Sequence, residues 1–322
     1  MTLSLRLPNS TIPTSRLGFG CAYLTGGLEL RASRRLVDTA LDAGYRHFDT
    51  APLYGIGTAE DVLGAALMHR RSDVTIATKV GISRPVLTVK TQIVRYISRP
   101  LRRYVRAIYQ RVSTNDGGEE IRNFSVGFVE ASLQESFRRL RTDRVDLLLL
   151  HEIELEDITE ELLTFLDKGR QGGAIGAIGI ASNRQRISRI VGAHDAFFDV
   201  LQYSWSVFEP EDEAWSAIRR HVTHRALMNA LDAIGHAISN DRTLSRQLSD
   251  IVGQDLADRA ILSKILLGAA VARNRDGIVL VGARQAGHIQ ANAELIENNT
   301  FVEAGQQLVK CMPLIVKSLP TP

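Results

Sequence analysis

The chain has 322 residues, 44% hydrophobic and 23% charged, which is close to the average for globular proteins and excludes a largely disordered or fibrous protein. The 39 Lys and Arg against 36 Asp and Glu leave a net charge of +3, too small to indicate a dedicated nucleic-acid binder. Two cysteines, Cys21 and Cys311, cannot form a disulfide framework, and no apolar run reaches the roughly 20 residues of a membrane span. With no secretory apolar region after Met1, we expect a cytoplasmic protein.

Short apolar runs alternate along the chain with longer stretches of helical periodicity. The runs predict eight strands, at Arg16–Ala22, Tyr45–Asp49, Val74–Lys79, Val145–His151, Ala177–Ser182, Asp199–Tyr203, His221–His224 and Gly277–Val281. The stretches predict helices at Leu28–Ala43, Thr58–His69, Ser125–Arg141, Ile158–Arg170, Arg184–Ala193, Asp212–Arg219, a long region ending near Ala272, and Gly287–Glu297. Thr58 with Asp61 is spaced like a capping box, and Ser125 fits an N-cap.

Eight strands, each followed by a helix, predict an α/β fold of the (β/α)8 TIM-barrel type, formed as one domain over residues 1–322. A doubly wound sheet is the rival, but Gly18-Phe19-Gly20 lacks the third glycine of a dinucleotide-binding turn. The glycines of Gly172–Gly179 precede a strand, so we interpret them as a loop that enters it. Leu3–Thr14 is interpreted as a hairpin below the barrel. A long basic insertion follows the third strand at about 82–123, and a C-terminal tail covers about 300–322.

Polar side chains occupy the carboxyl ends of consecutive predicted strands, where barrel enzymes carry their chemistry. They are Asp49 with Tyr54 just beyond it, Lys79, His151, Ser182 with Asn183, and Gln202. A free Tyr has a pKa of about 10, and a neighbouring ammonium lowers it by favouring the phenolate. Lys79 is the available cation, and Asp49 is the carboxylate that would hold it in place. His151 can orient a carbonyl oxygen. The set suits protonation of a developing oxyanion without a metal ion.

The segments Phe48-Asp49-Thr50-Ala51-Pro52-Leu53-Tyr54-Gly55, Thr78-Lys79 and Asp146-Leu147-Leu148-Leu149-Leu150-His151 resemble the signature of the aldo-keto reductase family. The sequence around Tyr54 is most similar to that of the aldose and pyridoxal dehydrogenase branch of the family. This resemblance implies that Tyr54 is the general acid/base, that Lys79 and Asp49 tune it, and that His151 positions the carbonyl.

The resemblance also implies a nicotinamide cofactor in extended form across the barrel mouth. By position, Ser182, Asn183 and Gln202 would hold its carboxamide, and Gly20, Cys21 and Ala22 would lie beside the nicotinamide ribose. Residues Gly282, Ala283, Arg284, His288 and Asn292 match the adenosine segment. NADP is the expected cofactor and NAD is the alternative, because the Lys and Ser that commonly hold a 2′-phosphate are replaced by Gly282 and Ala283.

Two further features depart from the family pattern. After the seventh strand, His224 and Arg225 stand where the family usually has an aromatic residue and a glycine-rich phosphate loop. In one interpretation His224 stacks on the nicotinamide and Arg225 binds a phosphate. In the other, both are simply residues at the rim of the barrel. The insertion carries eight basic residues and no acid between Ile82 and Asn115. This basic amphipathic stretch is compatible with a membrane surface, an acidic partner, a lid over the site, or helices packed on the barrel with their arginines in solvent.

The sequence therefore predicts an NAD(P)-dependent oxidoreductase that transfers a hydride between nicotinamide and a small-molecule carbonyl or alcohol: an aldehyde, a ketone or a sugar. The alternative is a non-catalytic or weakly catalytic nicotinamide-binding barrel with a regulatory or interaction role. No metal ion and no nucleic-acid partner are expected, and the oligomeric state is not predicted.

Overall fold

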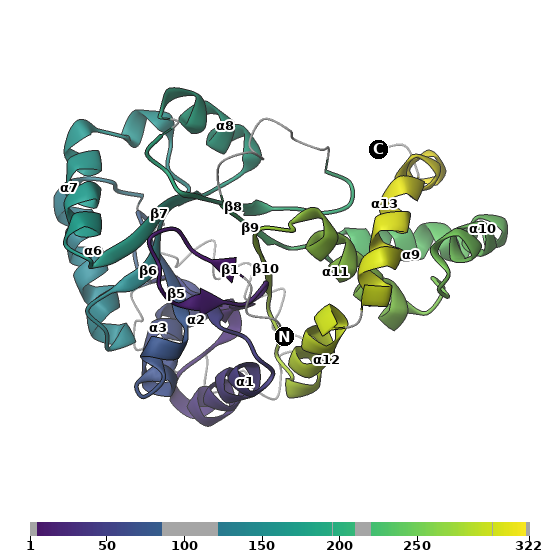
Figure 1. Ribbon diagram of the computed structural model, residues 1–322, viewed down its shortest axis with the longest axis horizontal. Coiled ribbons are helices and arrows are strands. Elements are labelled where there is room, and N and C mark those ends of the chain that lie inside the picture. The colour runs from purple at the N-terminus through teal and green to yellow at the C-terminus, as the bar shows by residue number, and fades with distance from the viewer. Residues whose placement is uncertain (1–4, 86–121, 195, 210–219, 298, 320–322) are drawn as a thin grey trace.

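The computed structural model describes residues 5–85, 122–194, 196–209, 220–297 and 299–319. Eight parallel strands close into a barrel in the order β10-β3-β4-β5-β6-β7-β8-β9 (Figure 1). The strands are β3 (Leu17–Gly20), β4 (His47–Asp49), β5 (Thr75–Val80), β6 (Val145–His151), β7 (Ile175–Ala181), β8 (Val200–Ser204), β9 (Arg220–His224) and β10 (Ile278–Val281). The predicted (β/α)8 barrel is confirmed.

Helices cover the outside of the barrel because each presents one apolar stripe to the strands. They are α1 (Leu30–Asp42), α3 (Ala59–Leu67), α6 (Val126–Leu140), α7 (Glu160–Gln171), α8 (Arg184–Ala193) and α12 (Ala286–Glu297). The short segment α2 (Tyr54–Gly57) follows β4 and is not regular helix, because Gly55 and Ile56 have left-handed backbones. The first strand is shorter than predicted, since Cys21–Tyr23 form a 3-10 turn. Ser125 precedes α6, but its side chain makes no capping hydrogen bond. The predicted helix over 212–219 and the insertion between 86 and 121 lie outside the described residues.

The hairpin predicted before the first barrel strand is confirmed. Strands β1 (Leu5–Arg6) and β2 (Pro13–Thr14) pair antiparallel and lie across the barrel in Figure 1. Leu5 and Leu7 are buried in one cluster with Ala77, Leu147 and other side chains of the barrel interior. The hairpin therefore closes the amino-terminal end of the barrel, which leaves the carboxyl-terminal end for chemistry.

The long helical region before β10 consists of α9 (Ala230–Asn240), α10 (Arg242–Val252) and α11 (Arg259–Arg273). Its breaks have local causes: the side chains of Asp241 and Asp258 accept hydrogen bonds from the first N–H groups of α10 and α11, and Gly253 ends α10 at a φ of 72°. Most of the predicted C-terminal tail forms the helix α13 (Asn299–Ser318), which packs along α11.

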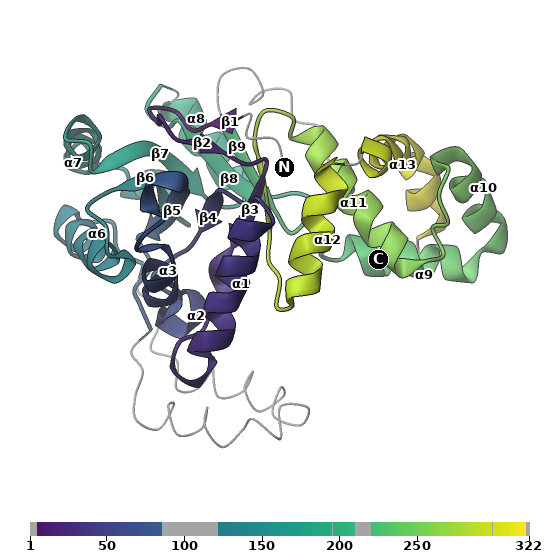
Figure 2. The ribbon, with the colours of Figure 1, turned by 60° about the horizontal axis from the view of Figure 1, so that its bottom comes forward.

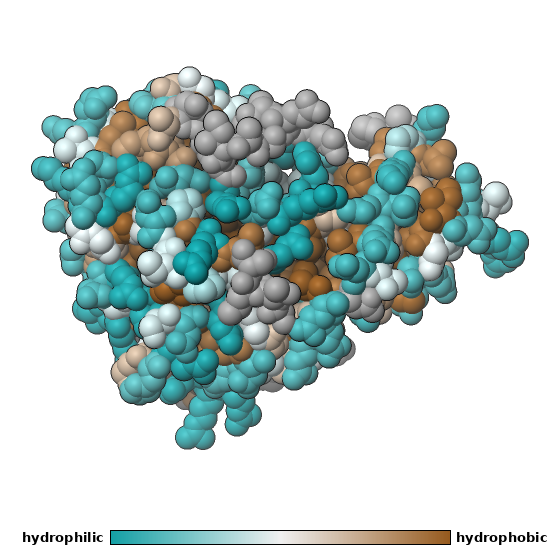
Figure 3. Space-filling view, in the orientation of Figure 1, coloured by the Kyte–Doolittle hydropathy of each residue, from teal (hydrophilic) through white to brown (hydrophobic). Residues whose placement is uncertain are grey.

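Helices α9, α10, α11 and α13 lie on the side of the barrel opposite α6 and α7 (Figures 1 and 2). Apolar residues reach the surface of these helices in Figure 3, and Ile251 of α10 and Val316 of α13 are exposed. Cys311 of α13 and Cys21 beside β3 are both buried and unpaired. No helix within the described ranges combines the length and apolarity needed to cross a lipid bilayer.

Candidate active site

A buried ion pair links the carboxyl ends of two neighbouring barrel strands. Lys79 of β5 donates from Nζ to both carboxylate oxygens of Asp49, at the end of β4, at 2.7 Å each, and to the Thr50 carbonyl at 3.0 Å. Lys79 is 1% exposed and Asp49 is 2% exposed. Burial acts to lower the pKa of Lys79, but Asp49 and Tyr54 outweigh it, so the pKa is raised and the ammonium stays charged.

The same carboxylate binds a third side chain, which the sequence associated only with the cofactor. Gln202 of β8 is buried and donates from Nε2 to Asp49 Oδ2 at 2.7 Å. Because β4 and β8 lie on different sides of the barrel, this hydrogen bond crosses the barrel mouth. Asp49 thus orients both an ammonium and a carboxamide.

Tyr54 lies directly against the ammonium. The Nζ atom of Lys79 is 4.8 Å from the centre of the Tyr54 ring. Burial raises the pKa of Tyr54 above its ordinary value of 10, while Lys79 pulls it down. The predicted direction of the Lys79 effect is therefore right, but the expectation of a lowered phenol pKa is wrong, because the loss of solvent is the larger effect.

A tight left-handed loop directly after Tyr54 holds this residue beyond the carboxyl end of β4. Gly55, Ile56 and Gly57 have φ values of 58°, 55° and 78°. A Cβ atom on Gly55 would overlap the backbone carbonyl of Leu24, so only glycine fits there. Thr58 Oγ1 donates to the Gly55 carbonyl at 2.7 Å and accepts from the Gly26 N–H at 2.9 Å. The predicted capping box is wrong because this hydroxyl fastens the loop instead of the helix end.

A second buried network supports the same loop, and sequence reasoning missed it. Glu60 of α3 is fully buried and forms an ion pair with Arg84, whose other nitrogen donates to the Gly57 carbonyl. Thr78 Oγ1 donates to Glu60 at 2.7 Å. Because Thr78 precedes Lys79, the network joins the Tyr54 loop to the strand that carries the ammonium. The sequence signal that could have indicated it is an acidic residue, Glu60, in the first turn of α3, ahead of the apolar residues of this helix.

Two histidines complete the barrel mouth as neutral imidazoles. Burial, with Lys79 second, lowers the pKa of His151 at the end of β6 from 6.5 to about 3. Burial likewise lowers the pKa of His224, at the end of β9, to about 4, although Asp49 acts in the opposite direction. Nδ1 of His151 is buried and has no hydrogen-bond partner among the described residues. An unpaired buried nitrogen beside Asp49 and Lys79 is a natural contact for a bound oxygen or N–H group.

The other candidate cofactor residues also lie at the carboxyl ends of the strands. Ser182 follows β7 and is buried, Asn183 caps α8, and Arg225 follows β9 at a φ of 64°. Gly20 ends β3, Cys21 and Ala22 follow it, and Gly282 and Ala283 follow the neighbouring strand β10. His288 and Asn292 lie beyond these strand ends, on α12. The Arg284 guanidinium stacks on the Tyr23 ring at 4.2 Å.

The donors and acceptors at the end of β7 and β8 fit a primary carboxamide such as that of nicotinamide. Asn183 uses its Oδ1 atom to cap α8, which leaves its NH2 group to donate. Gln202 uses Nε2 on Asp49, which leaves Oε1 to accept. Within the described residues, the Asn183 NH2 group and Gln202 Oε1 have no other partner. The barrel mouth therefore offers a bound carboxamide one donor and one acceptor.

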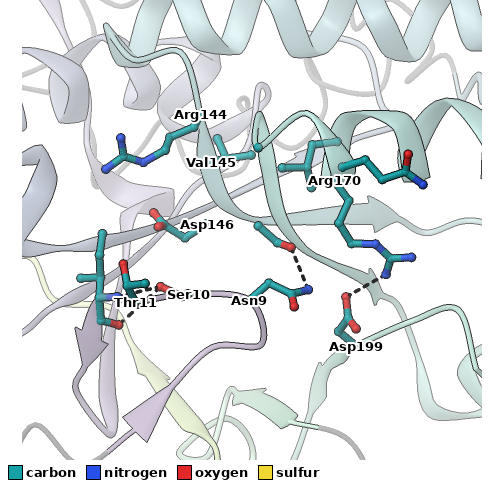
Figure 4. Close-up of a pocket in the computed structure, with 13 residues that line it drawn as sticks. Asn9, Ser10, Thr11, Arg144, Val145, Asp146, Arg170 and Asp199 are labelled. Atoms are coloured by element: carbon teal, nitrogen blue, oxygen red, sulfur yellow. Dashed lines mark hydrogen bonds and ion pairs between the residues drawn. The ribbon is translucent and has the colours of Figure 1, made fainter.

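A cavity of about 710 Å³ lies elsewhere, between the hairpin and the amino-terminal ends of β6 and β7 (Figure 4). Its acidic side chains serve the fold: Asp146 pairs with Arg71 at 2.8 Å and Asp199 pairs with Arg170 at 3.5 Å. The side chain of Asn9 donates to a β7 carbonyl at 3.3 Å. The cavity is therefore at the end of the barrel opposite Asp49 and Lys79.

This barrel, with a phenol, an ammonium, a carboxylate and an imidazole at its carboxyl-terminal mouth, matches a known family of barrels. The sequence model of the aldo/keto reductase family matches residues 16–230, and the chain belongs to this family. The matched range ends as α9 begins, so α9 to α13 lie beyond it.

Curated relatives include the two kinds of enzyme in the branch that the sequence resembles. The chain is 33% identical over 180 residues to D-threo-aldose 1-dehydrogenase of a Pseudomonas species, which covers 52% of this chain and 49% of the relative. It is 31% identical over 160 residues to pyridoxal 4-dehydrogenase of Microbacterium luteolum, with 46% and 42% covered. The match spans about half the length of these relatives.

Solved structures agree with the fold over the whole chain. The holo form of the aldo-keto reductase AKR11C1 from Bacillus halodurans is 22% identical with a TM-score of 0.69, covering 98% of this chain and 96% of that one. An aldo-keto reductase from Klebsiella pneumoniae in complex with NADPH is 16% identical with a TM-score of 0.65, covering 100% and 98%.

Proposed function

We propose that this protein is an NADP-dependent oxidoreductase that interconverts a small-molecule carbonyl and its alcohol, with Tyr54 as general acid and base. The observation that carries the proposal is the buried Lys79–Asp49 pair with Nζ 4.8 Å from the Tyr54 ring. A charged ammonium held against a phenol is suited to stabilise the phenolate left when the phenol gives up its proton.

Each side chain has a role that follows from its protonation state. In reduction, the Tyr54 hydroxyl donates its proton to the carbonyl oxygen, and Lys79 stabilises the resulting phenolate. Asp49 keeps Lys79 in place and charged. His151, being neutral, offers an N–H to the carbonyl oxygen and adds no competing charge. In oxidation, the Tyr54 phenolate accepts the proton of the alcohol.

A nicotinamide cofactor, when bound, supplies or accepts the hydride. Ser182, Asn183 and Gln202 would hold its carboxamide, and Gly20, Cys21, Ala22, His224, Arg225, Gly282, Ala283, Arg284, His288 and Asn292 would line the rest of its site. NADP is favoured by the family and by the NADPH complex of the Klebsiella relative. Arg284 is the cationic side chain beside Gly282 and Ala283, and NADPH binding no tighter than NADH would overturn this preference.

The decisive experiment is an assay at 340 nm with NADPH and a panel of aldehydes, ketones and sugars, together with measured cofactor affinity. Aldoses and pyridoxal belong in the panel because two relatives carry these substrates in their names. We expect turnover with at least one member. NADPH binding without turnover across the panel would favour the alternative, a nicotinamide-binding barrel with a regulatory role, and no binding at all would refute both.

A further inference from the structure

Glu152 binds the hydroxyl of a residue assigned to the carboxamide site. It directly follows His151, and its Oε2 atom accepts from Ser182 Oγ at 2.9 Å. The same oxygen accepts from Arg186 Nη1 at 2.5 Å, so the carboxylate is held from two sides. The Ser182 backbone N–H donates to the Gln202 carbonyl at 3.1 Å, which fixes Ser182 beside β8.

The backbone of Glu152 is held in an uncommon conformation. Its φ of 56° lies in the left-handed region, which non-glycine residues adopt only where their surroundings hold them there. The Glu152 N–H donates to the Ala181 carbonyl at 2.8 Å. The Glu152 carbonyl accepts from the Arg122 side chain at 3.3 Å. These bonds fix the direction of the Glu152 side chain relative to β7.

The contact with Glu152 decides what Ser182 can offer to a ligand. A hydroxyl can donate one hydrogen bond and accept two, and Ser182 uses its donor on the Glu152 carboxylate. Ser182 is thereby left as an acceptor. With Oε1 of Gln202 as a second acceptor and the NH2 group of Asn183 as a donor, the three side chains complement a primary carboxamide, which has two N–H groups and one carbonyl oxygen.

We propose that Glu152 is a positioning residue that turns the Ser182 hydroxyl into an acceptor for the carboxamide N–H of the nicotinamide cofactor. The inference rests on the proposed function, because it requires that the chain binds this cofactor. Glu152 touches Ser182 and Arg186, and acts on the ligand only through Ser182.

The affinities of the protein for two oxidised cofactors test this role of Glu152 directly. NADP+ carries the carboxamide, whereas its 3-acetylpyridine analogue has a methyl ketone and no N–H group to donate. We expect Glu152→Ala to weaken NADP+ binding about tenfold, the loss of one hydrogen bond of ordinary strength. Binding of the analogue should be unchanged or tighter. Titration calorimetry gives both dissociation constants.

Three further variants separate this role from a structural one. Glu154→Ala is the matched control, because Glu154 also pairs with Arg186, at 2.6 Å, but makes no contact with Ser182; both cofactors should bind it as they bind the wild type. Glu152→Gln keeps an acceptor for the hydroxyl and should restore most of the affinity for NADP+. In a Ser182→Ala background, Glu152→Ala should have no further effect.

Equal weakening of NADP+ and the analogue by Glu152→Ala would overturn the inference and leave Glu152 a structural role. Unchanged NADP+ affinity in that variant would overturn it as well. If Glu152→Ala does not fold, Glu152→Gln decides: a wild-type ratio of the two affinities supports the inference, and a ratio shifted tenfold toward the analogue contradicts it. A wild-type protein that binds neither cofactor would instead refute the proposed function.

Discussion

The ammonium of Lys79 lies 4.8 Å from the centre of the Tyr54 ring while it donates to both oxygens of Asp49. Two opposing effects on the phenol meet in this contact. Burial raises the pKa of Tyr54, and the ammonium lowers it. Asp49 fixes the position of the Lys79 ammonium. The pKa of Tyr54 therefore depends on the Lys79–Asp49 ion pair.

Removal of the ammonium should therefore cost both rate and stability. In Lys79→Met, burial and the Asp49 carboxylate both raise the pKa of Tyr54 with no cation to oppose them, and we expect kcat to fall by about 10²- to 10⁴-fold. Asp49 is left buried without a cation, so the free energy of unfolding should drop by roughly 3–5 kcal/mol. The double variant Asp49→Asn, Lys79→Met should regain part of that stability in urea titrations but none of the rate. A rate that recovers with stability would contradict this assignment.

The loop that carries Tyr54 should tolerate no side chain at Gly55. Gly55→Ala would press a Cβ atom against the Leu24 carbonyl, and we expect kcat to fall at least tenfold as Tyr54 is displaced. Gly173→Ala is the matched control, since Gly173 also has a positive φ, 77°, but faces open space. Steady-state kinetics and thermal midpoints of both variants test this. Equal effects on kcat would show that only backbone strain matters.

The buried Glu60–Arg84 pair should matter far more than its exposed neighbour. Glu60→Ala leaves the Arg84 guanidinium without its partner and should lower the free energy of unfolding by about 3–5 kcal/mol. Asp61→Ala removes a half-exposed carboxylate that pairs with Arg139 and should cost less than about 1 kcal/mol. Chemical denaturation compares the two. Similar losses would mean that the Glu60 network does not fasten the loop.

Three histidines that lose most of their contact with solvent should make the fold sensitive to mild acid. The pKa values of His47 and His224 lie at about 4 and that of His151 at about 3, each lowered mainly by burial. Because an unfolded histidine titrates near 6.5, the unfolded state takes up protons first as the pH falls. The free energy of unfolding should therefore decrease between pH 6.5 and 4, by about 1.4 kcal/mol per pH unit for each histidine.

A single replacement isolates this effect from that of the carboxylates, which titrate lower. His224→Phe should reduce the slope of unfolding free energy against pH by about one proton. Urea titrations at half-unit steps of pH measure the slope. A variant with the wild-type slope would show that His224 is not buried as a neutral imidazole.

The arrangement of Asp49, Lys79 and His151 could be predicted because it depends on topology. Each residue ends a strand, and a parallel barrel brings all carboxyl ends to one mouth. The sequence predicts the limits of β6 to the residue, because the apolar run Leu147–Leu150 lies at its centre and Arg144 precedes it. The roles of the cofactor residues stay predictions.

Contacts that depend on the reach of a side chain could not be predicted. Gln202 binds Asp49 from across the barrel, and Arg84 reaches Glu60 from the start of the insertion. The predicted shift of the Tyr54 pKa is wrong in direction. A motif reveals that Lys79 is a neighbour of Tyr54, but no motif reveals how far Tyr54 is removed from solvent. The capping box at Thr58 failed because spacing does not reveal that a hydroxyl has a better partner in the preceding loop.

The most direct test of the account is the Tyr54→Phe variant, which removes one oxygen from the ring and leaves the Lys79–Asp49 pair intact. On a substrate found in the panel, we expect kcat to fall by about 10³-fold or more, while the dissociation constant for NADPH stays within about twofold of the wild type. Substantial turnover in this variant, with the cofactor still bound, would contradict the assignment of Tyr54 as the proton donor.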